Sequence, residues 1–313
     1  MASKIKSIIR LLRIRQYYKN FMIFVGIFFS LRLFDISLYL PLLIGFALLC
    51  SASSFNYIVN DIRDIENDKK HPEKIRKKPL ASGDLSISFA VLVLIILIIF
   101  IVVSLIFIIP KNSTVGLTIM IVFIIATGQL YNHVLKNYAF IDIIILSTGY
   151  LWRAITGCII IGESISGWLY FAIFEIALFL SIAKRKGDLE LLGKEKAIEH
   201  KKVYDQYSQK LLDQFYVMIA VSIFMTYSLY LIFKFNLFIP EEANLNELFV
   251  VLTIPISLYI IMRFMYLTSA KPEIARSMEK AFLDKGLIIA SLIMFIILLL
   301  SFYLEEIVEM LNF

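Results

Sequence analysis

Charged residues are scarce in this sequence, and several common catalytic motifs are absent from it. Only 18% of the 313 residues are charged, whereas 60% are hydrophobic, and the mean hydropathy is +0.83. Soluble globular domains do not have this composition. The sequence contains no glycine-rich phosphate-binding loop, no HExxH zinc motif and no serine, histidine and aspartate set typical of a catalytic triad. We therefore expect a membrane protein whose chemistry depends on other residues.

Cysteine and histidine are also rare. The two cysteines, Cys50 and Cys158, each lie in a long apolar run, where small packing residues are more common than partners in a disulfide. The three histidines, His71, His133 and His200, are far apart, and none has another histidine or cysteine at the spacing of a metal site. These observations argue against a disulfide-stabilised fold and against a zinc site.

Long apolar stretches fill most of the chain. A helix needs about 20 residues to cross the apolar core of a bilayer, and we find nine stretches of suitable length. We therefore predict an all-α, polytopic membrane protein with nine transmembrane helices, in a single domain over residues 1–313. The predicted spans cover residues 17–34, 38–59, 86–109, 114–133, 139–161, 166–183, 213–235, 247–269 and 286–304.

Lysine and arginine fall mainly on one side of these spans. Basic residues are retained on the cytoplasmic side of a membrane, so the pattern predicts a cell (inner) membrane protein with a cytoplasmic N-terminus. The basic N-terminal segment has no small-residue cleavage site after its apolar run, and we interpret it as a retained amphipathic helix on the inner leaflet. The charged connections expected to face the cytoplasm and to hold the active site are at about residues 60–85, 131–138, 184–212 and 270–285.

The segment that begins at Asn60 contains three carboxylates at the end of the second span. Asp61, Asp64 and Asp68 are spaced i, i+3 and i+7, which places them on one side of a helix. Gathered carboxylates repel one another unless a cation lies between them, and their hard oxygen ligands suit Mg²⁺. The motif therefore predicts a Mg²⁺ and diphosphate site at a membrane surface, with Asn60 hydrogen-bonded to a ligand oxygen or to a metal-bound water.

A simpler alternative is a solvated acidic helix end, in which Arg63, Lys69 and Lys70 pair with the acids. The basic residues of the other cytoplasmic segments argue against it. Acids that hold a divalent ion and bases that face the same volume fit a polyanion between them, because the ion bridges phosphate oxygens while the bases neutralise the remaining charge. Departure of diphosphate from carbon needs charge stabilisation and alignment more than it needs covalent help from the protein.

Five further patches accompany the acidic motif, and together with it they resemble a known family. The pattern NDxxDxxxD at the foot of the second span is similar to the signature of the UbiA-type superfamily of intramembrane prenyltransferases. Across nearly the whole chain, the patches look most like the branch of decaprenyl-phosphate phosphoribosyltransferases. The patches are residues 15–20 (RQYYKN), 71–74 (HPEK), 131–136 (YNHVLK), 150–157 (YLWRAITG) and 184–189 (KRKGDL).

The resemblance implies a UbiA-type helical bundle and a transferase activity. The branch transfers a 5-phosphoribosyl group from phosphoribosyl pyrophosphate to a polyprenyl phosphate and releases diphosphate, with Mg²⁺ as the expected cofactor. The implied partners are these two substrates and the lipid bilayer, with no nucleic acid. The resembled branch can associate as a homo-oligomer, a trimer, whereas the residues themselves do not give the oligomeric state.

The resemblance, together with residue type and position, also suggests individual roles. The candidate phosphate and substrate contacts are Lys19, Lys74, Tyr131, Lys136, Lys184 and Arg185. Arg153 lies inside the predicted span 139–161, where an unpaired charge is costly, so either a substrate phosphate or an internal acid must compensate it. Asp188 is a candidate to stabilise positive charge that develops on the ribose ring, or to bind a ribose hydroxyl.

Two positions depart from the pattern of the branch. Asp188 stands where the branch usually has glutamate, and Lys78-Pro79 stands where it usually has arginine and proline. A lysine does not form the planar, two-pronged contact that an arginine makes with phosphate.

Two other functions are consistent with parts of the sequence. An ordinary UbiA-type prenyltransferase moves an isoprenyl chain from its diphosphate to an aromatic or other acceptor, and it usually has a second DxxxD motif after the sixth span. Here Lys184, Arg185 and Lys186 occupy that place, which favours a donor with more phosphate. A transporter of an anionic lipid or metabolite would account for Arg153, but we find no internal repeat, and the other charges gather at one membrane face.

Overall fold

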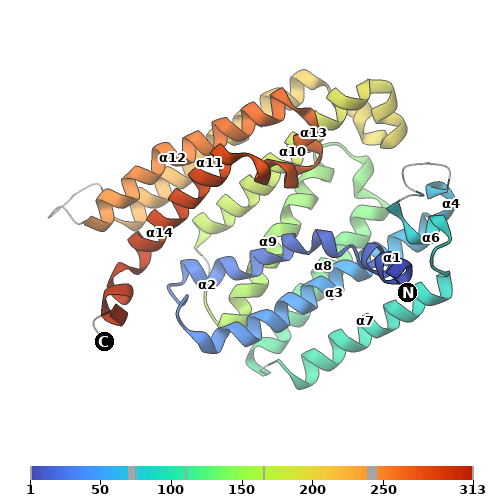
Figure 1. Ribbon diagram of the computed structural model, residues 1–313, viewed down its shortest axis with the longest axis horizontal. Coiled ribbons are helices and arrows are strands. Elements are labelled where there is room, and N and C mark those ends of the chain that lie inside the picture. Colours follow the sequence, from blue (N-terminus) through green and yellow to red (C-terminus); the bar gives the residue numbers. More distant parts are fainter. Residues whose placement is uncertain are drawn as a thin grey trace. The chain divides into compact units, whose positions relative to one another are not determined.

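Helices form every regular element in the part of the chain that the structure describes (Figure 1). This structure is a computed structural model, and it describes residues 2–69, 75, 77–109, 111–164, 166–237 and 245–311. The predicted all-α class is confirmed.

The helices belong to two compact units. The first unit contains residues 1–135 and 148–165, and the second contains residues 136–147 and 166–313. The division falls within α9 (Ile141–Ile161), so the first turns of this helix belong to the second unit and the later turns to the first.

The remaining elements follow one another along the chain. The first unit contains α1 (Ala2–Leu12), η1 (Ile14–Phe24), α2 (Val25–Phe29), η2 (Ile36–Leu38), α3 (Tyr39–Arg63), α4 (Ile65–Asp68), α6 (Pro79–Ser82), α7 (Ile87–Phe107) and α8 (Lys111–His133). The short η3 (Leu135–Asn137) lies at the boundary. The second unit contains α10 (Gly167–His200), η4 (Lys202–Gln206), α11 (Gln209–Lys234), α12 (Leu245–Ala270), α13 (Pro272–Arg276), η5 (Met278–Leu283) and α14 (Lys285–Leu311).

Eight helices within the described ranges are long and apolar enough to cross a membrane. They match the second to the ninth predicted spans, so a polytopic helical membrane protein is confirmed, whereas the count of nine is not. The eight segments are Ile36–Arg63, Ile87–Phe107, Lys111–His133, Ile141–Ile161, Gly167–Glu199, Gln209–Lys234, Phe249–Ala270 and Lys285–Leu304.

The first predicted span, residues 17–34, does not form one long α-helix. Its chain forms the 3-10 helix η1 and then the five-residue α2, and it turns at Leu31, where φ is 59°. The reason lies in its polar side chains. Asn20 is buried inside the unit, and its Nδ2 donates to Cys50 Sγ at 3.2 Å. The segment therefore packs polar groups against its neighbours and presents no continuous apolar helix.

The surface of α7 indicates the medium around the helices. Ile96, Ile99, Ile106 and Phe107 are all exposed along this helix. A water-soluble protein rarely leaves so many large apolar side chains together on its surface. Lipid tails are as apolar as these side chains, so a bilayer is the medium that this surface fits.

Polar side chains hold α3 against α8 in the first unit. Asn56 Nδ2 donates to the carbonyl oxygen of Ile124 at 3.0 Å, and Gln129 Nε2 donates to Asn56 Oδ1 at 2.6 Å. Ser53 and Ser54 are buried on α3, and such small residues allow close approach between membrane helices. These contacts fix the C-terminal half of α3, which leads into the acidic motif.

One face of α9 is shaped for close contact with η1. Gly149, Arg153 and Gly157 are four residues apart, so they lie along the same side of the helix. A methyl group added at Gly157 would overlap the backbone carbonyl of Ile23 in η1. Glycine at this position therefore allows the two backbones to approach, and it brings Asn20 of η1 within reach of Arg153.

We expect Gly157→Ala to destabilise the protein, because neither backbone can yield without displacing its helix. Overpacking of this kind costs about 1–3 kcal/mol. The measurement is the Tm of the detergent-solubilised protein. Gly167→Ala is the matched control, since an added methyl there has nothing within 4 Å. Equal Tm values for the two variants would contradict the close approach of η1 to α9.

Candidate active site

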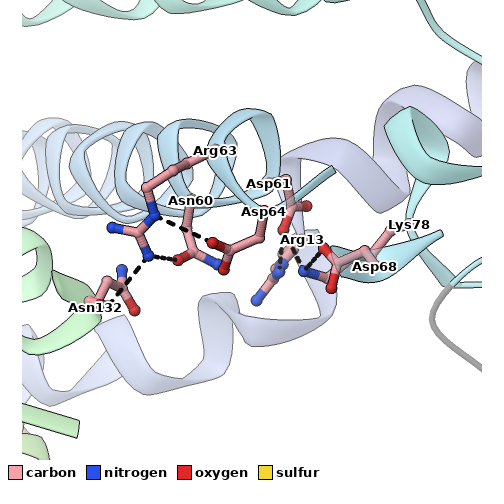
Figure 2. Close-up of polar contacts among 8 residues, drawn as sticks. All are labelled: Arg13, Asn60, Asp61, Arg63, Asp64, Asp68, Lys78 and Asn132. Carbon is pink, nitrogen blue, oxygen red and sulfur yellow. Dashed lines mark hydrogen bonds and ion pairs between the residues drawn. The ribbon is translucent and has the colours of Figure 1, made fainter. Parts of the chain in front are cut away.

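Lys78 lies between two of the three motif carboxylates. Its Nζ is 3.0 Å from Asp61 Oδ1 and 2.5 Å from Asp68 Oδ2 (Figure 2). Arg13 Nη2 donates to the same oxygen of Asp61 at 2.7 Å. The side chains of Asp61 and Asp68 are only 2% and 3% exposed. A buried carboxylate is costly without a partner, so the two cations compensate this acidic pair.

The local chain structure places Lys78 beside the acids. It precedes the short helix α6, which has Pro79 at its first position and ends at Gly83, where φ is 79°. Leu80 of α6 is buried in a cluster with Leu11 of α1 and other side chains of the acidic-motif region. Apolar packing therefore fixes α1 and α6 around the end of α3.

Arg13 reaches Asp61 from an unusual backbone conformation. Its φ and ψ are 52° and 45°, the left-handed region, which is uncommon for a residue with a side chain. The guanidinium also lies over the ring of Tyr57, 4.4 Å from the centroid. The ion pair and the cation–π contact offset the cost of this conformation, and they attach the end of α1 to the acidic motif.

Asp64 faces a different partner. Arg63 Nε donates to Asp64 Oδ1 at 3.1 Å, while Arg63 Nη2 donates to Asn60 Oδ1 at 3.0 Å and to the carbonyl of Asn132 at 3.1 Å (Figure 2). Helix α3 ends at Arg63 and α4 begins at Ile65, so Asp64 occupies the junction between them. The predicted i, i+3, i+7 spacing therefore brings Asp61 and Asp68 together, and it leaves Asp64 in contact with Arg63.

The pairings also bear on the alternative of a solvated acidic helix end. Arg63 does pair with Asp64, whereas Lys69 pairs with Glu66, which is outside the motif. Lys70 lies outside the described residues. Since Asp61 and Asp68 are buried, the motif as a whole is not a solvated helix end.

The residues fit a divalent cation by their chemistry. Asp61 and Asp68 supply hard oxygen donors, and the ammonium of Lys78 already lies where a cation between them would be. In the described part of the chain, no three His, Cys, Asp or Glu side chains gather as a metal site. With a divalent ion at this position, Asp61 and Asp68 would bind the ion in place of Lys78 and Arg13.

Arg153 lies near the middle of α9 among neutral partners. Its Nε donates to Asn20 Oδ1 at 2.6 Å, its Nη1 donates to the carbonyl of Gly149, and its Nη2 is 3.4 Å from Ser53 Oγ. No carboxylate lies within ion-pair distance of this guanidinium in the described ranges. We predicted that either a substrate phosphate or an internal acid compensates Arg153. The described residues supply no such acid.

The structure places the other predicted substrate contacts on several elements. Lys19 is in η1 and Tyr131 is near the end of α8, while Lys136 is in η3, and all three are partly exposed. Lys184 is exposed on α10. Lys74, like His71, lies outside the described residues. The roles of these side chains stay predictions.

Arg185, the neighbour of Lys184, is buried at the centre of a polar network in the second unit. Its Nε and Nη2 both contact Asp142 Oδ2 at 2.8 Å, and its Nη1 donates to the Tyr204 hydroxyl at 3.2 Å. Tyr207 donates to the other oxygen of Asp142 at 2.6 Å. The network joins the first turn of α9 to α10 and η4, so it accounts for Arg185 structurally, and contact with substrate stays a prediction.

Asp188 belongs to the same network. Its Oδ2 accepts from the Tyr204 hydroxyl at 2.5 Å, and its Oδ1 lies 3.2 Å from Arg276 Nε. The carboxylate is 5% exposed. Burial, together with the negative charge and hydrogen bond of Asp188, raises the pKa of Tyr204. Asp188 is therefore held by protein groups in this structure, and its predicted role toward ribose is not tested.

Several site residues were not singled out from the sequence. Arg13 counted only as one of many N-terminal basic residues, and Asp142 and Tyr204 carry no motif. Lys201 follows α10, and burial together with the nearby Arg185 and Lys184 lowers its pKa well below the usual range. The sequence signals that pointed to this region were the basic residues at 184–186 and Asp188.

The model of one protein family matches residues 20–285, which is most of the chain, and it describes the UbiA prenyltransferase family. The chain belongs to this family. The UbiA-family protein is therefore a multi-pass membrane transferase.

Curated relatives of this UbiA-family protein bear a more specific name. A decaprenyl-phosphate phosphoribosyltransferase of Mycolicibacterium smegmatis is 29% identical over 236 residues, covering 72% of this chain and 70% of the relative. A protein of the same name from Corynebacterium glutamicum is 27% identical over 232 residues, covering 72% and 67%.

Solved structures share the UbiA fold with this protein. A UbiA homologue from Archaeoglobus fulgidus, bound to DMAPP and Mg²⁺, has a TM-score of 0.62 and 14% identity, covering 95% of this chain and 98% of the other. A digeranylgeranylglyceryl phosphate synthase has a TM-score of 0.60 and 20% identity, with 96% and 97% covered. At these identities the likeness concerns the fold alone, and it confirms the predicted UbiA-type helical bundle.

We expect Asp142→Asn to destabilise the protein by about 3–5 kcal/mol, because it removes the carboxylate charge that contacts Nε and Nη2 of the buried Arg185. Unfolding of the detergent-solubilised protein, followed by Tm or denaturant midpoint, measures the effect. Glu66→Gln serves as the control, since its ion pair with Lys69 is exposed and we expect a change within about 1 kcal/mol. Similar losses in both variants would argue against a buried, structural role for Asp142.

Proposed function

We propose that this UbiA-family enzyme transfers a 5-phosphoribosyl group from phosphoribosyl pyrophosphate to a polyprenyl phosphate and releases diphosphate, with Mg²⁺ as its divalent ion. The observation that carries the proposal is the arrangement of charge in the first unit. An acidic motif suited to a metal and diphosphate is accompanied by Arg153, which has no carboxylate partner within the described ranges. Two phosphorylated substrates bring several anionic groups, whereas an isoprenyl diphosphate with an uncharged acceptor brings one. The names of the two curated relatives give independent support.

The acidic motif is proposed to bind the metal and the diphosphate. Asp61, Asp64 and Asp68 would supply oxygen ligands, and Asn60 would hydrogen-bond a ligand oxygen or a metal-bound water. A bound divalent ion neutralises charge on the departing diphosphate. Lys78, released from Asp61 and Asp68, is then free to contact phosphate. The remaining proposed substrate contacts are Lys19, Lys74, Tyr131, Lys136, Arg153, Lys184 and Arg185.

The proposed reaction is a single displacement at the anomeric carbon of ribose. An ionised oxygen of the lipid phosphate forms the new C–O bond, while the bond from that carbon to the diphosphate oxygen breaks and its electron pair leaves with the diphosphate. The attacking oxygen is already ionised at pH 7, so the reaction needs no strong general base. Alignment and charge stabilisation supply most of the acceleration, and Asp188 is a candidate to stabilise positive charge on the ribose ring.

The proposal includes the setting of the enzyme. The distribution of lysine and arginine supports an inner-membrane location with the N-terminus and the acidic motif on the cytoplasmic side. The proposal treats residues 1–313 as a single membrane domain and keeps Lys184 as a candidate phosphate contact. Association as a trimer remains an expectation from the family resemblance.

A prenyltransferase that moves an isoprenyl chain is the second candidate. The family description and the DMAPP-bound homologue favour it. Purified protein in detergent, supplied with Mg²⁺, labelled phosphoribosyl pyrophosphate and a polyprenyl phosphate, discriminates the two. We expect a labelled lipid. Consumption of an isoprenyl diphosphate without any labelled phosphoribosyl lipid would favour the second candidate. Uptake of an anion by protein-containing vesicles, without either reaction, would indicate a transporter.

In the same assay, we expect Asp61→Asn and Asp64→Asn each to lower turnover by about 100-fold or more, because each removes a charge that faces the metal–diphosphate complex. Chelation of divalent ions should abolish turnover, and added Mg²⁺ should restore it. Glu66→Gln is the matched control on α4, because this acid is exposed and pairs with Lys69, and we expect near-normal activity. Near-normal turnover in either aspartate variant would remove the acidic motif from the mechanism.

A further inference from the structure

Arg153 is a membrane-embedded cation with only neutral partners. Its three hydrogen-bond acceptors are an amide oxygen of Asn20, the backbone carbonyl of Gly149 and the hydroxyl of Ser53. Asn20 and Ser53 are buried, at 1% and 7% exposure, so the guanidinium points into the first unit rather than to lipid. These contacts orient the charge without neutralising it.

Another arginine in a membrane-spanning helix has a different environment. Arg263 of α12 contacts both oxygens of Asp284, at 3.1 and 2.8 Å. Its hydrogen bonds lower the pKa of Asp284 to about 2, which keeps this carboxylate ionised. The comparison shows how the fold neutralises an arginine when both charges belong to the protein. Arg153 has no such anion in the described part of the chain.

A charge at this depth costs several kcal/mol unless it is paired. Arg153 is the thirteenth residue of the 21-residue α9, so it lies about 18 Å along the helix from Ile141. The residue as a whole is only partly buried. The structure thus has the orientation and the missing charge of an anion site.

The position of Arg153 separates this site from the acidic motif. Its neighbour Ser53 precedes Asp61 by eight residues on the same helix, α3, which corresponds to about 12 Å. A group bound at Arg153 is therefore distinct from a diphosphate bound at the acidic motif, and it lies farther from that end of α3.

Arginine also suits a particular anion. The guanidinium has five N–H groups in a planar fork, and its contacts with Asn20, Gly149 and Ser53 use three of them. Two N–H groups remain, which is the number used in a bidentate contact with phosphate.

We propose that Arg153 is the centre of a second anion subsite, which binds a phosphate monoester near Ser53, about two turns of α3 before Asp61. The inference rests on the proposed function, because that function supplies the two candidate phosphate monoesters. They are the 5-phosphate of the ribosyl donor and the phosphate of the lipid acceptor. Both present the same dianionic group.

Direct binding tests the subsite. We measure the rise in Tm that ribose 5-phosphate or farnesyl phosphate produces in the detergent-solubilised protein. We expect Arg153→Gln to abolish the rise for at least one probe and Arg153→Lys to reduce it. Arg263→Lys, the same change at an acid-paired arginine, should keep it. Loss with ribose 5-phosphate assigns the donor, and loss with farnesyl phosphate assigns the acceptor. Equal rises in wild type and Arg153→Gln, or no rise in wild type with either probe, overturn the subsite.

Asn20→Asp provides a second test that does not remove the arginine. It places a carboxylate where the Asn20 amide oxygen lies, 2.6 Å from Arg153 Nε, and so supplies the missing anion within the protein. We expect a higher Tm without ligand and loss of the rise with the same probe. A structural role for Arg153 alone predicts no loss of ligand response. Retention of the full response in this variant contradicts the proposal.

Kinetics separate this inference from the proposed function. With an active wild type, Arg153→Gln should raise KM for the substrate whose phosphate occupies the subsite by about tenfold or more. An unchanged KM for both substrates overturns the subsite and leaves the proposed function intact. An inactive wild type contradicts the proposed function, whereas the binding measurements still decide whether Arg153 binds a phosphate monoester.

Discussion

A charge inside an apolar medium needs a partner of opposite sign, and this constraint organises the polar interior of the protein. Lys78 meets Asp61 at the end of α3, and Arg185 meets Asp142 where α9 begins. Each pair joins segments that are distant in the sequence, so the same contact neutralises charge and fixes the fold. Arg153 departs from this rule, because its described partners are neutral. The departure lies within the unit that also contains the acidic motif.

The membrane fold was largely predictable because apolar length alone identifies a helix that can cross a bilayer. Eight predicted spans match helices of the structure. Residues 17–34 met the same criterion, yet they form η1 and α2. Hydropathy measures how apolar a segment is, but it does not show that Asn20 is buried against Cys50, or that Gly157 lets this segment approach α9. Those contacts depend on tertiary packing.

The sequence indicated the acids of the candidate site more directly than its bases. Helical spacing predicted three acids on one side of a helix, whereas α3 ends at Arg63, Asp64 pairs with Arg63, and Asp61 and Asp68 share Lys78. Arg13 reaches them through a left-handed backbone conformation that no sequence pattern indicates. For Arg185, the sequence suggested a role that the contacts do not require. Its position beside Lys184 suggested contact with substrate, whereas the buried side chain pairs with Asp142, 43 residues away. Long-range pairs of this kind are invisible in a single sequence.

The ion pair between Asp142 and Arg185 also sets an order of assembly. Synthesis proceeds from the N-terminus, so α9 is made before α10. Arginine keeps its proton, so Arg185 is a permanent cation. Its anion is therefore already present on the first turn of α9 when α10 is made, and the two charges come together as the second unit folds.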